Sequence, residues 1–306
     1  MAKDENMVQD DYSADELIIR KKKAPELKEG VTAESVLASA AQALEAVRAK
    51  SPLVHCMTNV VAANFTANAL LAFGAQPAMV EDVGEVSQFS TVADAVLVNL
   101  GTVTKPQGDA MRAAVSHANM GGRPWVLDPV AVGSLLPLRT FLAKELMRRF
   151  PAVIRGNASE IAYLAGNEKV ASRGVSAAVT SDEVAPLVGR LAAVTHAAVL
   201  VTGAVDYVAL EGAPLVAIEN GTPLMTRVTG VGCVQGALAA AFLGALGGKA
   251  RWEAALAAAL VPAIAGEMAA EKATTPGSFQ AAYLDALDAI TPQDVLTRGR
   301  VQIHAS

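Results

Sequence analysis

The sequence predicts an α/β domain in which helices cover both faces of a mostly parallel central sheet. Short runs of continuous apolar residues, such as AVLVN at 95–99, alternate with amphipathic helical segments along most of the chain. Continuous apolar strands are typical of a sheet that is buried on both faces. The chain has 306 residues, of which 52% are hydrophobic, and this is enough to bury a substantial core. Because no linker rich in proline or serine divides it, we expect one domain at 35–306 after a charged, flexible N-terminal extension at 1–34.

The individual elements are predicted from the period of the apolar residues and from the glycines and prolines that bound them. Helices with one apolar face are expected at 32–50, 64–74, 105–122, 138–150, 157–166 and 181–195. Short apolar strands are expected at 53–58, 77–80, 93–101, 124–130, 152–156 and 197–203. A meander of neighbouring strands is expected at 206–212, 214–220 and 223–229, followed by an almost entirely helical stretch from 232 to 290. The repeated alternation of strand and helix is what predicts the parallel order.

Composition narrows the classes of function. The net charge is −5 and the domain has no long basic run, which argues against nucleic acid or an anionic membrane as a partner. Two cysteines, Cys56 and Cys233, cannot form a disulfide framework and suit a reducing cytoplasm. The polar, acidic start of the chain is unlike a signal peptide. Residues 228–248 are uncharged and long enough to span a bilayer, but they are mostly glycine and alanine, so we expect a buried helix there.

The strongest local motif is TRVTGVGCVQGALAAAF at 226–242, where a strand-like alternation runs into two glycines and then a helix of small residues. Gly230 and Gly232 allow positive φ angles and let a ligand approach the backbone closely. The free N–H groups and the dipole at the start of the helix favour an anion. The motif is not a dinucleotide-binding fingerprint, which needs a third glycine at Gln235, and the chain has no P-loop. We therefore expect an anion hole, with a tight turn for helix–sheet packing as the structural alternative.

Cys233 lies at the start of the same helix. A helix N-terminus lowers the pKa of a thiol, which would favour a reactive thiolate. A cysteine nucleophile also needs a nearby base, and only His55 of the four histidines lies in a candidate loop. Covalent catalysis therefore has little support, although it predicts that Cys233→Ser abolishes activity. No group of His, Cys and Asp has the spacing of a zinc site.

Polar residues close several of the predicted strands, where ligands bind in open α/β sheets. Asp128 is either a turn-forming residue or a carboxylate near a metal and a phosphate, because Mg²⁺ needs only one or two carboxylates. Asn157 and Glu160 have the spacing of a capping box, whereas Arg155 at the mouth of a buried strand needs an anionic partner such as a phosphate. Thr202 closes a further strand.

Three residues near the first two strands have both a structural and a functional interpretation. His55 and Asn59 either form hydrogen bonds within a loop or contact a small substrate. Met79 either fills the core or forms the apolar wall of a pocket. Spacing in the sequence does not decide between these interpretations.

Seven blocks of the chain, in order and at the right separations, resemble the hydroxyethylthiazole kinase family. They are SPLVHCMTNVVAANFTANALLAFGAQPAM, LVNLGT, VLDPVAVG, IRGNASEIAYLAG, VTGAVDYV, TRVTGVGC and PGSFQAAYLDAL. The resemblance implies a ribokinase-like three-layer sandwich, a homotrimer, and phosphorylation of the primary alcohol of 4-methyl-5-(2-hydroxyethyl)thiazole with ATP and Mg²⁺ in thiamine biosynthesis. Another small-alcohol kinase of this fold, for a pyrimidine or pyridine alcohol, and a non-catalytic nucleotide-binding regulator are the alternatives.

The resemblance also implies roles for individual residues. Met79, Gly230 and Asn59 match substrate-binding positions. Arg155 and Thr202 match ATP-binding positions, and Asp128 and Glu160 match acidic residues associated with Mg²⁺ and phosphate. Catalysis would fall to Cys233 together with Gly230 and Gly232, since related sugar kinases carry an aspartate base where this chain has Cys233. The chain departs from the family at Gln235 and Gly236, because relatives often have a small hydroxyl residue soon after the cysteine.

Overall fold

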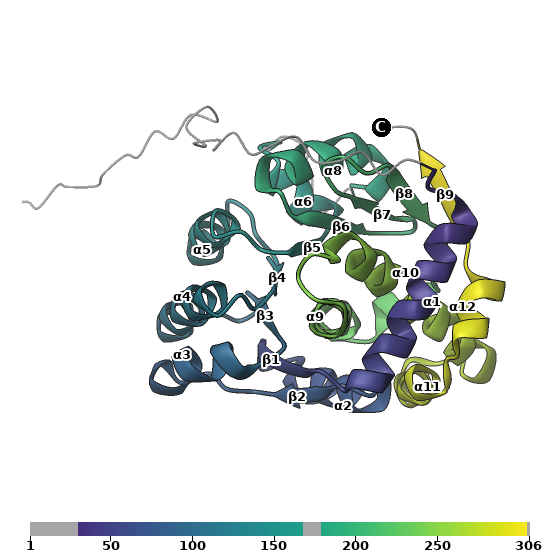
Figure 1. The fold of residues 1–306 in the computed structure, drawn as a ribbon, viewed down its shortest axis with the longest axis horizontal. Helices are drawn as coiled ribbons and strands as arrows, with labels where there is room; N and C mark the ends of the chain where they lie inside the picture. Colours follow the sequence, from purple (N-terminus) through teal and green to yellow (C-terminus); the bar gives the residue numbers. More distant parts are fainter. Residues whose placement is uncertain (1–29, 168–178, 305–306) are drawn as a thin grey trace, which may run out of the picture.

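A sheet of nine strands forms the centre of the molecule, in the order β2-β1-β3-β4-β5-β6-β7-β8-β9 (Figure 1). The structure is a computed structural model that describes residues 30–167 and 179–304. Each strand from β2 to β6 in this order pairs in parallel with its neighbour, and β7, β8 and β9 continue the sheet antiparallel. The bounds are β1 Leu53–Met57, β2 Gln76–Ala78, β3 Ala95–Asn99, β4 Trp125–Asp128, β5 Val153–Asn157, β6 Ala198–Thr202, β7 Asp206–Ala209, β8 Leu215–Ile218 and β9 Val301–His304.

Helices cover both faces of the sheet, as the sequence predicts (Figure 1). One layer consists of α3 Val83–Val92, α4 Lys105–Met120, α5 Pro137–Met147, α6 Ala158–Leu164 and α8 Ser181–Thr195. The other consists of α1 Ala33–Lys50, α2 Ala63–Phe73, α9 Val231–Leu246, α10 Arg251–Lys272, α11 Pro276–Ala289 and α12 Pro292–Arg298. Each layer packs on the sheet through its own apolar core. The result is a three-layer sandwich.

Small residues bring α9 close to the sheet. Its residues from Ala237 to Leu243 are fully buried. A Cβ at Gly244 would lie 3.1 Å from side-chain atoms of Asp94 and Pro52, so glycine permits this approach. Nearer the start of α9, a Cβ at Gly236 would lie 3.0 Å from Asp128 Oδ2, so the first turns of this helix lie beside the carboxyl end of β4.

The structure corrects one predicted element and, in the described residues, adds others that the sequence analysis did not predict. Residues Pro223–Arg227 form a 3-10 helix, η1, and not the strand expected at 223–229. Pro223 offers no N–H to a strand partner, and the Thr222 side chain accepts a hydrogen bond from the Leu224 N–H. Helix α3, which Asp82 caps, helix α12 and the edge strand β9 were not predicted.

The long apolar helices lie inside the fold. The uncharged stretch at 228–248 contains α9, which is buried as expected. In the described part of the chain, α10 alone is long and apolar enough to cross a membrane, and 78% of its apolar window is buried against other parts of the protein. Its composition is accounted for by its place in the core.

The predicted extension at 1–34 lies almost wholly outside the described residues. Helix α1 begins at Ala33, shortly before the domain boundary predicted at residue 35, and Thr32 and Ser35 form its capping box.

Candidate active site

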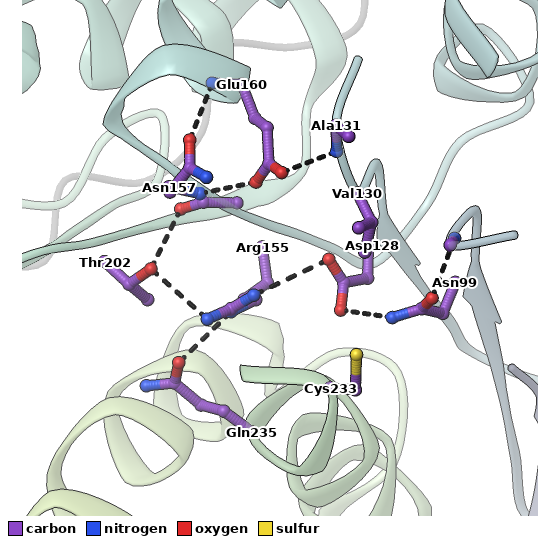
Figure 2. A network of polar contacts seen from close by, with 12 residues as sticks. Asn99, Asp128, Val130, Ala131, Arg155, Asn157, Glu160, Thr202, Cys233 and Gln235 are labelled. Carbon is purple, nitrogen blue, oxygen red and sulfur yellow. Dashed lines mark hydrogen bonds and ion pairs between the residues drawn. The ribbon is translucent and has the colours of Figure 1, made fainter. Parts of the chain in front are cut away.

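The carboxyl ends of the six parallel strands meet at one edge of the sheet and carry most of the predicted site residues. In the spatial order β2, β1, β3, β4, β5, β6, the residues at or directly after these ends are Met79, Asn59, Asn99, Asp128, Asn157 and Thr202. Parallel order places residues from distant parts of the sequence side by side. The first turn of α9 contains Gly232 and Cys233. Figure 2 shows Cys233 near Asp128 and Asn99.

A buried ion pair lies at the centre of this edge. Arg155 Nη1 is 3.6 Å from Asp128 Oδ1, and Asn99 donates a hydrogen bond of 2.7 Å to Asp128 Oδ2 (Figure 2). The Asp128 side chain is fully buried, yet its Oδ1 has no hydrogen-bond donor. Burial raises the pKa of Asp128 to about 7, against the opposing effect of the Arg155 charge. Asp128 is thus a buried carboxyl group with one oxygen available to a ligand.

The guanidinium of Arg155 is held from several sides. Its Nη2 donates to Thr202 Oγ1 at 3.2 Å, and its Nε donates to Gln235 Oε1 at 3.1 Å. Burial alone would lower the pKa of Arg155, but the nearby charges of Asp128 and Glu160 raise it. The group is therefore a permanently charged cation in a fixed orientation.

The two glycines before Cys233 have different roles. Gly230 has a φ of 93° and forms the N-cap of α9, where no side chain caps the helix. Gly232 does not have the positive φ that we expected, because it already lies within α9. Instead, a Cβ there would lie 3.0 and 3.2 Å from the terminal nitrogens of Arg155. Gly232 thus lets the guanidinium lie against the first turn of α9.

Cys233 differs from the expectation for a thiol at a helix N-terminus. Burial and the charge of Asp128 raise its pKa, so the thiol form predominates at neutral pH. Asn59 Nδ2 donates to Cys233 Sγ at 3.3 Å and to Asn99 Oδ1 at 2.9 Å. Asn59 Oδ1 accepts from the N–H groups of Val61 and Ala62. Asn59 therefore links the start of α2 to the side chains around Cys233.

Glu160 forms the predicted capping box with Asn157 at the start of α6. Its Oε2 accepts from the Asn157 N–H, and its Oε1 accepts from the Ala131 N–H, both at 2.7 Å. Ala131 has a positive φ of 59°, so Glu160 also stabilises an unusual turn after β4. Both carboxylate oxygens of Glu160 are already hydrogen-bonded within the protein.

His55 and Met79 lie toward the β2 edge of the sheet. We expected His55 to lie in a loop, but it lies in β1 and has no exposed surface. Its Nε2 donates at 2.8 Å to the carbonyl oxygen of Val80, which is the residue directly after Met79. Met79 is 36% exposed, so its side chain is available to line a pocket rather than fill the core.

The sequence did not single out Asn99 or Asp206, and it suggested no partner for Gln235. Asn99 holds Asp128, while Gln235 and Asp206 hold Arg155 and the turn after β6. A polar residue at the end of an apolar strand was the signal for Asn99. For Gln235, the signal was an amide in a helix of otherwise small and apolar residues.

The residues present fit a bound Mg²⁺ at Asp128. This ion prefers oxygen ligands and often uses one or two carboxylates together with water and substrate phosphates. Asp128 Oδ1 is a buried oxygen without a donor. Within residues 30–167 and 179–304, His, Cys, Asp and Glu do not gather in a group of three that would hold a metal by themselves. A metal here would therefore share its coordination with a ligand.

Comparison of this chain with solved structures first identifies its fold class. A ribokinase-like superfamily protein from Enterococcus faecalis V583 covers 85% of this chain and 96% of its own length, with a TM-score of 0.57 and 11% identity. A pyridoxal kinase from Staphylococcus aureus, in complex with AMP-PCP and pyridoxal, covers 83% and 98% with a TM-score of 0.56 and 15% identity. At such identities the likeness concerns the fold alone, and the fold is ribokinase-like.

The particular family follows from stronger matches. The model of the hydroxyethylthiazole kinase family matches residues 44–293. A hydroxyethylthiazole kinase from Cronobacter sakazakii is 49% identical over 82% of this chain and 92% of its own. One from Tolumonas auensis is 48% identical over 83% and 95%. The solved hydroxyethylthiazole kinase structure from Pyrococcus horikoshii OT3 is 37% identical, covers 86% and 98%, and has a TM-score of 0.78. The chain belongs to the hydroxyethylthiazole kinase family.

Proposed function

We propose that this protein transfers the γ-phosphoryl group of ATP to the primary alcohol of 4-methyl-5-(2-hydroxyethyl)thiazole, a step of thiamine biosynthesis and salvage. The observation that carries the proposal is the buried Arg155–Asp128 pair beside the uncapped first turn of α9. Phosphoryl transfer depends mainly on positioning and on neutralisation of the phosphate charge. A fixed cation, uncapped backbone N–H groups and an available carboxylate oxygen suit this reaction.

Arg155 and Thr202 bind the nucleotide in this proposal. The N–H groups of the first turn of α9 and the Arg155 guanidinium stabilise the transferring phosphate as an anion hole. Gly230 provides the backbone turn, and Gly232 lets Arg155 lie beside that turn. Both glycines therefore serve catalysis through the position of the phosphate.

Asp128 holds Mg²⁺ in this proposal, and Glu160 contributes chiefly by fixing the turn at Ala131. When bound, Mg²⁺ supplies positive charge that offsets the charge of the phosphates. Because both oxygens of Glu160 accept backbone N–H groups, we assign Asp128 the main part of the acidic site.

Met79 and Asn59 serve the substrate. Met79 provides an exposed apolar surface for the uncharged thiazole ring, and Asn59 orients Cys233 through its side-chain amide. Cys233 carries a thiol rather than a thiolate at neutral pH, since its pKa is raised. We propose that it orients the attacking hydroxyl and forms no covalent intermediate.

A coupled assay of ADP release over a panel of alcohols tests the function. We expect turnover that needs ATP and Mg²⁺ and that prefers hydroxyethylthiazole to pyridoxal and to a hydroxymethylpyrimidine. Equal rates on all three alcohols would support a general alcohol kinase. ATP binding without turnover on any alcohol would support a regulator. Either result would contradict the proposal.

We further propose a homotrimer in the cytoplasm. Exposed apolar residues near the β2 edge offer an interface, among them Val60, Val61, Leu71 and Val83. Both cysteines are free, which suits a reducing compartment. Light scattering on the purified protein would give the mass of the assembly.

A further inference from the structure

Gln235 is a buried amide in a helix made almost entirely of small and apolar residues. Only 8% of its surface is exposed. A buried amide costs free energy unless its donors and acceptor find partners. Its presence in the second turn of α9 therefore needs a reason.

Both ends of the Gln235 amide are hydrogen-bonded. Its Oε1 accepts from Arg155 Nε at 3.1 Å, and its Nε2 donates to Asp206 Oδ2 at 3.2 Å. A guanidinium only donates and a carboxylate accepts, so these partners fix which end of the amide faces which side. Gln235 thus forms a bridge between the guanidinium of Arg155 and the carboxylate of Asp206.

Asp206 extends the bridge to the turn between β6 and β7. Its Oδ1 accepts from the Gly203 N–H at 2.9 Å. Thr202, at the end of β6, accepts from Arg155 Nη2 at 3.2 Å. A closed network therefore joins α9, β5 and the turn at 203–205.

This network determines how the guanidinium is presented. Gln235 occupies Nε and Thr202 occupies one N–H of Nη2, while Nη1 stays 3.6 Å from Asp128, too far for a hydrogen bond. The group lies against Gly232 at the start of α9. Without Gln235, Arg155 would keep its charge but lose one side of its support.

We propose that Gln235 is a positioning residue that holds Arg155, and with it the turn at 203–205, in the arrangement that binds the phosphates of ATP. The inference rests on the proposed role of Arg155 in nucleotide binding. The residues at 235 and 236 suit this role. Gln235 is long enough to span from α9 to both partners, and Gly236 leaves room for Asp128, whose Oδ2 would lie 3.0 Å from a Cβ there.

The first test is Gln235→Met, which keeps the length of the side chain and removes both hydrogen bonds. Loss of a hydrogen bond to a charged group typically changes an equilibrium constant by about 10- to 100-fold. We expect kcat/KM for ATP and affinity for a non-hydrolysable ATP analogue to fall by that order, while the KM for the thiazole changes little. Constants within twofold of those of the parent would overturn the inference.

A polarity swap provides the rescue. In the double variant Gln235→Glu with Asp206→Asn, the carboxylate introduced at position 235 would accept from Arg155 Nε and from the amide introduced at position 206. The oxygen of that new amide would still accept from the Gly203 N–H, so the bridge and its net charge are restored. Gln235→Glu alone places two carboxylates together and should bind the analogue poorly. The double variant should recover most of the loss. If it is no better than either single variant, the bridge does not position Arg155.

Asn220 offers a matched control outside the Arg155–Gln235–Asp206 network. It is a buried amide that donates to Glu267 and the Arg298 carbonyl oxygen and accepts from the Arg300 N–H. Asn220→Leu should lower the melting temperature and leave both KM values unchanged. If the parent binds the ATP analogue but phosphorylates no thiazole, the proposed substrate is wrong, and the binding data still decide the role of Gln235.

Discussion

At the scale of the residue, Gly232 is a position in α9 against which the Arg155 guanidinium lies. A methyl group there would come within 3.0 to 3.2 Å of the Arg155 terminal nitrogens. The backbone of Gly232 is helical, so alanine fits the main chain and raises helix propensity. The conflict concerns only the guanidinium.

We therefore expect Gly232→Ala to separate activity from stability. The thermal midpoint should stay level or rise, while kcat/KM for ATP falls by about tenfold or more because Arg155 is displaced from the phosphate position. Steady-state kinetics and a thermal melt on the same preparation give both quantities.

Gly189 in α8 is the control for this substitution. A Cβ there would meet nothing within 4 Å, and the residue is exposed in a helix. Gly189→Ala should stabilise the protein by about 0.5–1 kcal/mol without changing the kinetics. If both variants keep full activity, the close approach of Arg155 to Gly232 has no part in catalysis.

The same residues show how far sequence can predict a site. The glycine pair predicted an anion hole, but the sequence could not show that Gly232 makes room for Arg155, because that contact joins residues 77 positions apart (232 − 155). The position of Cys233 on a helix predicted a lowered pKa. Burial and Asp128 reverse the sign, and both depend on packing. Partners across the fold were the missing information.

At the scale of the element, β1 holds the segment that carries Met79. His55 on β1 donates to the Val80 carbonyl oxygen, and its Nδ1 lies 3.1 Å from Ser90 Oγ on α3. Its ring also packs edge-on against Phe89, with 5.1 Å between ring centres. Burial lowers the pKa of His55, so the neutral ring predominates at physiological pH. One side chain thus connects β1, the segment after β2 that carries Met79, and α3.

His55→Phe should loosen this segment while keeping the ring contact with Phe89. We expect the KM for the thiazole to rise by about three- to tenfold, from the loss of one hydrogen bond, with the KM for ATP unchanged. Initial rates with each substrate varied in turn measure the split. His117→Gln on α4, whose ring Nδ1 contacts the Ala113 carbonyl oxygen of the same helix, serves as the control. Equal changes in both KM values would assign His55 to general stability instead.

Elements were predicted well where their pattern is local. The parallel strands and helix α8 at Ser181–Thr195 follow from apolar runs and helical periods. The 3-10 helix at Pro223–Arg227 was taken for a strand because it follows two short apolar runs of strand length in the sequence. Strand β9 was missed because its half-buried residues gain their partner only when the C-terminus pairs with β8. The alternation of apolar and polar residues in VQIH is a strand pattern, but it extends over four residues only.

At the scale of the whole molecule, the site places ionisable groups inside the protein. Asp128 and Asp206 are both buried, and burial is the main reason why their pKa values rise, to about 7 and about 6. Charged groups away from water reduce stability unless they are fully paired. The fold tolerates this cost because the large apolar layers on both sides of the sheet stabilise the rest of the molecule.

The cost should appear as a dependence of stability on pH. Asp206 has a folded pKa of about 6, raised from 3.8, so the folded state binds its proton more tightly than the unfolded state. Between these two values the folded protein holds more protons, and the free energy of unfolding therefore falls as pH rises through this window. Above about pH 6, Asp206 is ionised in both the folded and the unfolded state, so its contribution to the free energy of unfolding no longer changes with pH. Asp206→Asn cannot ionise, so its stability relative to the parent should increase from about pH 4 to about pH 7, as urea unfolding in metal-free buffer would measure.

Asp285 on α11 provides the reference, because it is an exposed carboxylate on the surface of the same fold. Asp285→Asn is measured over the same pH range as a control for the substitution itself. The parent should still show some decrease toward neutral pH from Asp128, which acts in the same direction. The comparison therefore rests on the difference between Asp206→Asn and the parent. A difference that stays flat, or that falls with rising pH, would mean that Asp206 is already ionised at low pH in the folded protein, with the Gly203 and Gln235 hydrogen bonds outweighing its burial.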